Sequence, residues 1–264
     1  MPYGPSPDLL RDRAILVTGA GDGIGAAAAK AFAAHGATVV LVGRTVAKLE
    51  AIYDAIEQAG HPQPAIYPID LEGATSYDFD AMAGRLEQVL GRLDGILHDA
   101  ATFPYLSRID DYDPDVWGKV LQVNLSAPFM LTRACLPLLR GSPDASVVML
   151  SDAVGRHARA YWGAYAVSKA GLEALVQVLA DELSHAPVRI NSLDPGATRT
   201  TLRAQAYPTE DPAHLKPPEA VTPFLLSCLA EATRGASLEA NLALLRANAT
   251  LAAQIAAAVA SGRT

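Results

Sequence analysis

Short apolar runs that alternate with longer helical stretches constrain the fold of this chain more than any other feature of its sequence. The runs are continuous rather than alternating in polarity, and they lie at residues 14–17, 37–42, 65–69, 95–97, 146–150 and 188–193. Continuous apolar strands are buried on both faces, which is the pattern of a parallel sheet covered by helices. We therefore predict a parallel sheet built from these runs.

Helical spacing fills the intervals between the runs, over residues 23–35, 46–59, 74–90, 114–139 and 163–183. Repeated strand–helix units of this length are typical of a doubly wound, Rossmann-like α/β fold with helices on both faces of the sheet. The sequence has no internal repeat and no low-complexity linker, so we expect a single domain over residues 1–264.

Two regions depart from this rhythm, one inside and one after a Rossmann-like body that we place at residues 8–240. Residues 197–218 are rich in Thr, Arg and Pro and have no clear period, which is typical of a lid over a substrate site. Residues 241–264 are rich in Ala, with leucines near helical spacing, and we expect a C-terminal helical extension there.

The charge balance excludes several classes of function. The chain has a net charge of −7, whereas general binders of nucleic acid or anionic membranes are basic. No apolar run approaches the ~20 residues of a membrane-spanning helix, and the first residues lack the segments of a signal peptide. Cys135 and Cys228 lie far apart and the histidines lack metal-ligand spacing, so we predict no metal site. We expect a cytoplasmic protein without a membrane or nucleic-acid partner.

A glycine-rich turn follows the first predicted strand, in the segment Thr18-Gly-Ala-Gly-Asp-Gly-Ile-Gly25. Glycines between a strand and a helix let the backbone approach a pyrophosphate, and the helix N-terminus offers free N–H donors. The alternative is a plain tight turn with no ligand. A strict GxGxxG pattern fails because Ile24 occupies its last position, and the spacing that fits is TGxxxGxG.

Arg44 follows the end of the second predicted strand. A carboxylate at this strand end would bind a ribose 2′-hydroxyl and favour NAD, and none is present. A guanidinium here pairs well with a 2′-phosphate, which favours NADP(H). The alternative is a solvated surface arginine.

Tyr165 and Lys169 lie four residues apart at the start of the long helix that follows the fifth strand. This spacing places both side chains on one helix face. A lysine ammonium favours the phenolate form of a nearby tyrosine and lowers its pKa toward working pH. The pair is therefore a candidate for proton exchange with a substrate oxygen.

With the TGxxxGxG turn and the YxxxK pair in these positions, the chain resembles the short-chain dehydrogenase/reductase family over roughly residues 10–240. The sequence around residues 156–169 and 198–212 looks closest to the YciK-type bacterial oxidoreductases of that family. The resemblance implies hydride transfer between NADP(H) and a small carbonyl or alcohol. It also implies a homodimer or homotetramer that pairs through the helices at 114–139 and 163–183.

The resemblance also implies roles for individual residues. Tyr165 would be the acid/base, Lys169 would hold the nicotinamide ribose and tune Tyr165, and Asn124 would anchor a water in the proton relay. Asp70 and Leu71 would contact the adenine, and residues 195–200 would line the nicotinamide side. The expected cofactor contacts are Thr18, Gly19, Gly23, Ile24, Gly25, Arg44, Asp70, Leu71, Ala100, Tyr165, Lys169, Pro195, Gly196, Thr198 and Thr200.

Asp152 stands where the family has its catalytic serine, thirteen positions before the tyrosine. An ionised Asp accepts hydrogen bonds but donates none, and it opposes a nearby phenolate. Ser151 is one position too early, so its side chain should point away from the site. Two hypotheses remain open: an active oxidoreductase in which Asp152 weakens catalysis, and an NADP(H)-binding protein that has lost efficient chemistry.

The family's Asn-Asn-Ala-Gly stretch also differs, and reads His98-Asp99-Ala100-Ala101. Asp99 replaces an amide that ties neighbouring strands together, and Ala101 adds a methyl group beside the cofactor. We interpret His98 as a histidine satisfied by local hydrogen bonds rather than as a catalytic group.

Overall fold

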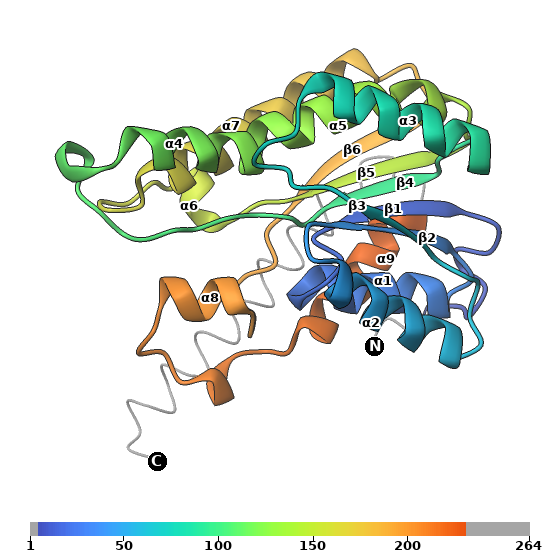
Figure 1. Cartoon of the computed structure of the whole chain (residues 1–264), viewed down its shortest axis with the longest axis horizontal. Helices are drawn as coiled ribbons and strands as arrows, with labels where there is room; N and C mark the ends of the chain where they lie inside the picture. Colours follow the sequence, from blue (N-terminus) through green and yellow to red (C-terminus); the bar gives the residue numbers. More distant parts are fainter. Residues whose placement is uncertain (1–4, 231–264) are drawn as a thin grey trace.

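The computed structural model describes residues 5–230, and within this range the chain forms a six-stranded parallel sheet of order β3-β2-β1-β4-β5-β6 (Figure 1). Every neighbouring pair is parallel, and the register places Val17 beside Leu41 and Leu97. The predicted fold class is confirmed. The strands are β1 (Ala14–Thr18), β2 (Thr38–Gly43), β3 (Ala65–Pro68), β4 (Gly95–His98), β5 (Ala145–Leu150) and β6 (Val188–Leu193).

Helices cover both faces of the sheet and bury two apolar cores (Figure 1). One face packs against α1 (Gly23–Ala34), α2 (Val46–Gln58) and α9 (Thr222–Ala230). The other packs against α3 (Ser76–Leu90), α5 (Ala127–Arg140) and α7 (Gly163–Glu182). β1, β4 and β5 are buried along their whole length, as continuous apolar strands predict.

The long helix predicted over 114–139 contains a change of register. It begins as α4 (Pro114–Leu121), where Asp113 caps the first turn, passes through a π-helical segment at Gln122–Ser126, and continues as α5. Pro128 has no N–H and cannot donate to the carbonyl of residue 124, so an unbroken α-helical ladder is not available there. Asn124 therefore lies, buried, in the π-helical segment where the α-helical hydrogen-bond pattern is interrupted.

Two short helices, α6 (Ala153–Arg156) and α8 (Thr201–Ala206), were not predicted from the sequence. Each starts at a polar capping side chain and has no hydrophobic period. α8 lies inside the predicted lid, and Thr200 Oγ1 accepts a hydrogen bond from Arg203 N. Asp152 caps α6, and its side chain accepts from Val154 N. Such caps form turns too short to show a hydrophobic period. The lid therefore has more regular structure than expected.

The helical extension expected at 241–264 lies outside the described residues. Among the helices of residues 5–230, none combines the length and the hydropathy needed to cross a bilayer.

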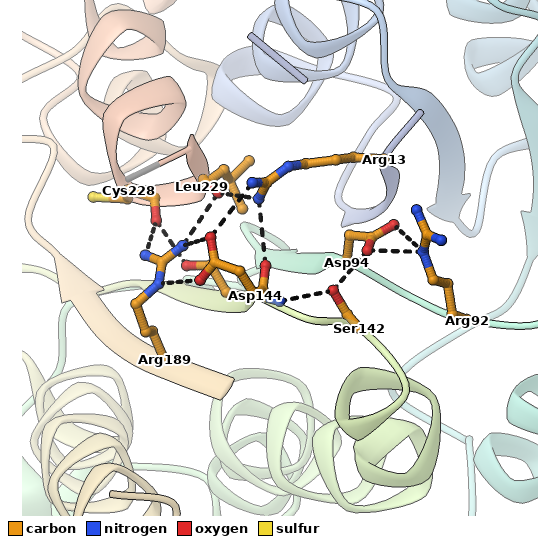
Figure 2. Close-up of polar contacts among 9 residues, drawn as sticks. Arg13, Arg92, Asp94, Ser142, Asp144, Arg189, Cys228 and Leu229 are labelled. Carbon is orange, nitrogen blue, oxygen red and sulfur yellow. Dashed lines mark hydrogen bonds and ion pairs between the residues drawn. The ribbon is translucent and has the colours of Figure 1, made fainter. Parts of the chain in front are cut away.

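An ion cluster joins the amino ends of the strands to the end of α9 (Figure 2). Asp144 accepts from Arg189 Nε at 3.0 Å and pairs with Arg13 at 3.4 Å. The same guanidinium groups donate to the last carbonyls of α9: Arg189 to Cys228 O at 2.7 Å and Arg13 to Leu229 O at 2.8 Å. The cluster therefore fixes the last described turn of α9 to the sheet.

Asp94 ties the same edge together from the start of β4 (Figure 2). Its carboxylate accepts from Ala14 N at 2.9 Å, from Ser142 Oγ at 2.7 Å and from Arg92 Nε at 3.0 Å. A buried carboxylate with three donors is satisfied, and it locks β1 and β4 in register.

We predict that Asp144→Ala lowers the free energy of unfolding by about 1–3 kcal/mol, because it leaves two largely buried guanidinium groups, of Arg13 and Arg189, without their common anion. Urea denaturation measures this loss. Asp80→Ala is the matched control, since Asp80 pairs with Arg133 at the surface, where one ion pair contributes ~0–1 kcal/mol. Equal effects of the two substitutions would show that the cluster does not hold α9.

Candidate active site

A cavity of about 690 Å³ lies at the carboxyl ends of the strands. Loops after β1, β4, β5 and β6 line it, as is usual for ligand sites in open α/β sheets. Most residues expected at the site line this cavity: Gly19, Gly23, Ile24, Arg44, Asp70, Leu71, Ala100, Asp152, Tyr165, Lys169, Pro195, Gly196, Thr198 and Thr200. Thr18, Gly25 and Asn124 lie behind the lining.

The glycine turn is shaped for close approach at two positions. Gly19 has φ +71°, and a Cβ there would lie 2.9 Å from Ala100 N. A Cβ on Gly25 would lie 2.4 Å from the carbonyl oxygen of Gly19. Only residues without a side chain fit at these two positions, so the turn brings its backbone and the first turn of α1 to the cavity, where Asp22 Oδ1 accepts from Gly23 N at 2.7 Å. This cradle fits the phosphates of a dinucleotide.

Behind the turn, Thr18 and Asp99 hold the loop after β4. Thr18 Oγ1 accepts from the backbone N–H groups of Asp99 and Ala100, both at 3.2 Å. Asp99 Oδ2 accepts from Gly25 N at 2.9 Å. Burial raises the pKa of the Asp99 carboxyl to about 7, against the lowering effect of the Gly25 hydrogen bond and Lys169. An ionisable group thus replaces the family's neutral amide directly behind the turn.

Arg44 is exposed at the end of β2, and it lines the cavity beside Asp70 and Leu71. Lys48 is a second cation at this end that the sequence analysis did not single out. Its ammonium pairs with Asp22 at 2.8 Å. Arg44 is therefore the better placed of the two to meet a phosphate beyond the ribose.

Tyr165 meets Asp152 directly. The Tyr165 hydroxyl donates to Asp152 Oδ2 at 3.3 Å, and Asp152 Oδ1 accepts from Val154 N at 3.0 Å as the cap of α6. Burial, followed by the Asp152 carboxylate, raises the pKa of Tyr165 well above its usual 10. The phenol is therefore held as a neutral hydrogen-bond donor. α6 packs closely on α7 at Gly155, where a Cβ would lie only 2.8 Å from the Lys169 backbone.

Lys169 lies beneath the ring of Tyr165, with its Nζ 5.7 Å from the ring centroid. The ammonium donates to the carbonyl oxygen of Leu150 at 2.7 Å. Burial lowers the pKa of Lys169, although the carboxylates around it act in the opposite direction. The YxxxK pair is thus assembled beside the cavity as its helical spacing predicts.

Asn124 is buried in the π segment, and its side-chain amide forms hydrogen bonds with other residues of the protein. Oδ1 accepts from Thr102 N at 2.8 Å, and Nδ2 donates to Thr102 O at 3.0 Å and Ser168 Oγ at 3.1 Å. It therefore orders the loop after β4. The water-anchoring role stays a prediction.

Ser151 lines the cavity, although its side chain was expected to point away from the site, and its Oγ is buried without a hydrogen-bond partner among the described residues. His98 lies as expected. The His98 ring nitrogen Nε2 lies 2.9 Å from Thr132 Oγ1, and burial lowers the pKa of this histidine to about 3. His98 is therefore a neutral, satisfied core residue.

An aromatic wall borders Tyr165 and was not predicted. The rings of Phe103 and Trp162 lie 5.4 and 5.8 Å from that of Tyr165, and Tyr207 lies 5.7 Å from Trp162. All three line the cavity. They come from the loop after β4, the start of α7 and the lid, so only the tertiary fold brings them together.

We predict that Asp99→Asn stabilises the protein at pH 8 by up to about 4 kcal/mol, because a pKa raised from 3.8 to about 7 marks an anion that folding disfavours. The folded carboxyl keeps a proton that the unfolded chain releases, so parent stability falls as pH rises from about 4 to 7. The variant should lack this fall, and chemical denaturation across this range measures it. Identical pH profiles would contradict the environment described for Asp99.

Comparison with known proteins places this site in a family. A sequence profile of the short chain dehydrogenases matches residues 13–211, and one described as Indigoidine synthase A like protein matches residues 198–258. The uncharacterized oxidoreductase YciK of Escherichia coli K12 is 46% identical over 234 residues, which cover 89% of this chain and 92% of that protein.

Solved structures agree. A short chain dehydrogenase from Pseudomonas syringae is 50% identical with a TM-score of 0.86, and the match covers 89% of this chain and 96% of that one. A short chain dehydrogenase from Escherichia coli CFT073 complexed with NADPH is 46% identical with a TM-score of 0.85, covering 87% and 95%. Site, profile and relatives agree: the chain belongs to the short-chain dehydrogenase/reductase family of oxidoreductases.

Proposed function

We propose that this protein transfers a hydride between NADP(H) and a small carbonyl or alcohol, with Tyr165 as the proton donor. The observation that carries the proposal is the buried Tyr165–Lys169 pair at one end of a cavity whose other end holds the glycine turn and Arg44. The NADPH complex of the similar Escherichia coli protein supports the choice of cofactor.

Different residues along the cavity have different proposed roles. The N-terminus of α1 and the glycine turn bind the phosphates, and Arg44 pairs with the 2′-phosphate. The bound nicotinamide supplies or accepts the hydride. Lys169 lies where it can hold the nicotinamide ribose, and Tyr165 gives its proton to the oxygen of the reduced carbonyl. Because its pKa is raised, Tyr165 is protonated at neutral pH, which is the form that carbonyl reduction requires and alcohol oxidation does not.

A second candidate function is an NADP(H)-binding protein with impaired chemistry. The hydrogen bond from Tyr165 to Asp152 favours it. After proton transfer to a carbonyl oxygen, the phenolate would face the Asp152 carboxylate, and like charges at this distance repel. Turnover with a panel of carbonyl compounds distinguishes the two functions.

We predict that Arg44→Ala weakens NADPH binding by ~10–100-fold and leaves NADH binding nearly unchanged, since one charge-assisted pair to the 2′-phosphate is lost. Titration calorimetry with both cofactors measures this. Arg85→Ala on the exposed face of α3 is the control and should change neither affinity. A parent protein that binds NADH more tightly than NADPH would overturn the assignment.

We predict that Asp152→Ser raises carbonyl reduction by ~10-fold or more, because it supplies a hydroxyl donor and removes the repulsion of the phenolate. Ser also caps helices, so α6 should be retained. Tyr165→Phe should abolish the gain. Steady-state rates with saturating NADPH test both variants, and a rate in Asp152→Ser at or below the parent rate counts against an impairing role for the carboxylate.

We further propose a cytoplasmic homodimer or homotetramer that pairs through α5 and α7. Phe129 on α5 and Val167 and Val178 on α7 are about half exposed, which is apolar surface that a pairing interface would cover. Light scattering at micromolar concentration should report a dimer or tetramer. A monomer under these conditions would remove this proposal, and Phe129→Glu should shift the mass downward.

A further inference from the structure

We propose that the preferred substrate is a cation in which the carbon that receives the hydride is doubly bonded to nitrogen, with Asp152 as its counter-ion and the aromatic wall as its binding surface. This inference rests on the proposed function for its hydride donor and changes only the substrate class.

The charge around Tyr165 is the first observation. Asp152, Asp194 and Asp99 all act on this hydroxyl. Lys169 faces the same carboxylates and donates to the carbonyl oxygen of Leu150. Arg203, on which the Asp152 charge also acts, is paired with both oxygens of Glu210, at 2.6 and 2.7 Å. Asp152 forms no direct ion pair among the described residues, so a cation bound there would balance the carboxylate nearest the Tyr165 hydroxyl.

Asp152 has the capacity to bind such a cation. One oxygen accepts from Val154 N and the other from the Tyr165 hydroxyl, which leaves lone pairs on a carboxylate that lines the cavity. Serine at this position would donate a hydrogen bond to a carbonyl oxygen. A carboxylate accepts one from an N–H⁺ group instead.

Proton balance favours the cation over a ketone. Reduction of a ketone makes an alkoxide that takes the Tyr165 proton and leaves a phenolate 3.3 Å from the Asp152 carboxylate. Hydride addition to R₂C=NHR′⁺ breaks the C=N π bond, whose electrons become the nitrogen lone pair, and gives the neutral amine R₂CH–NHR′ and NADP⁺. No proton leaves Tyr165 in that step, so no second anion forms beside Asp152.

The aromatic wall is the independent observation. Phe103, Trp162 and Tyr207 line the same cavity beside Tyr165. Aromatic faces carry negative electrostatic potential and bind organic cations, most strongly when water is excluded. The guanidinium of Arg203 lies 3.7 Å from the centroid of the Tyr207 ring, so one ring of this wall already binds a cation of the protein itself.

The test compares three compounds of similar size with NADPH: 3,4-dihydroisoquinoline, its permanently charged N-methyl iminium salt, and the neutral ketone α-tetralone. NADPH oxidation is followed by absorbance and the products by mass spectrometry. Iminium ions are intrinsically more reactive than ketones, so the measured quantity is the ratio of their kcat/KM values in the parent relative to Asp152→Ser and Asp152→Asn. Ser and Asn are both good N-cap residues, so both variants should retain α6.

We expect the iminium-to-ketone ratio to fall by ~10–100-fold in both variants, the scale of one charged hydrogen bond or ion pair. Asp152→Ser should gain ketone turnover as it loses turnover of both iminium compounds. An unchanged or increased ratio, with α-tetralone still reduced, overturns the inference and leaves the proposed function standing.

A binding measurement keeps the two proposals separable. Benzyltrimethylammonium, which accepts no hydride, should bind the NADP⁺ complex of the parent ~10-fold or more tightly than that of Asp152→Ser, whereas benzyl alcohol should not discriminate. Equal binding of the quaternary cation by parent and variant overturns the inference. If the parent protein binds NADPH but turns over none of the three compounds, the proposed function is overturned instead.

Discussion

The parallel alignment of β1, β4, β5 and β6 is the constraint on which the rest of this molecule depends. Because the strands point the same way, the loops after all of them open at one edge, and the groups of the candidate site are contributed there. The opposite edge carries the Asp94 and Asp144 clusters, which hold strands and α9 in place (Figure 2). Stability and chemistry are therefore separated at the two ends of the sheet.

At the carboxyl edge, the proposed chemistry rests on the contact between Asp152 and Tyr165. In a serine-bearing site, the tyrosine proton and the serine hydroxyl both point to a carbonyl oxygen. Here the tyrosine proton points to a carboxylate. Burial, followed by this carboxylate, raises the pKa of Tyr165. In the proposals above, the carboxylate that weakens the site for a neutral ketone would strengthen it for a cation. Asp99 adds a second carboxyl behind the glycine turn, so two of the departures from the family pattern introduce a carboxyl group at the site.

The strands and the five long helical stretches could be predicted from sequence, because continuous apolar runs and helical periods are local signals. The YxxxK pair was predicted for the same reason, since i and i+4 always share a helix face. α6 and α8 are started by single caps at Asp152 and Thr200, and no periodicity marks them. The partners of Asn124 and the aromatic wall depend on contacts between distant segments, which no local pattern encodes.

The ionisation of the Tyr165 phenol tests the central role of Asp152 most directly. Ultraviolet difference titration of the parent and of Asp152→Ser, each with its Tyr165→Phe counterpart subtracted, isolates this one hydroxyl. The account predicts that Tyr165 stays protonated well above the ordinary phenol pKa of ~10 in the parent, and ionises at distinctly lower pH in Asp152→Ser. Superimposable titrations of the two proteins would contradict it.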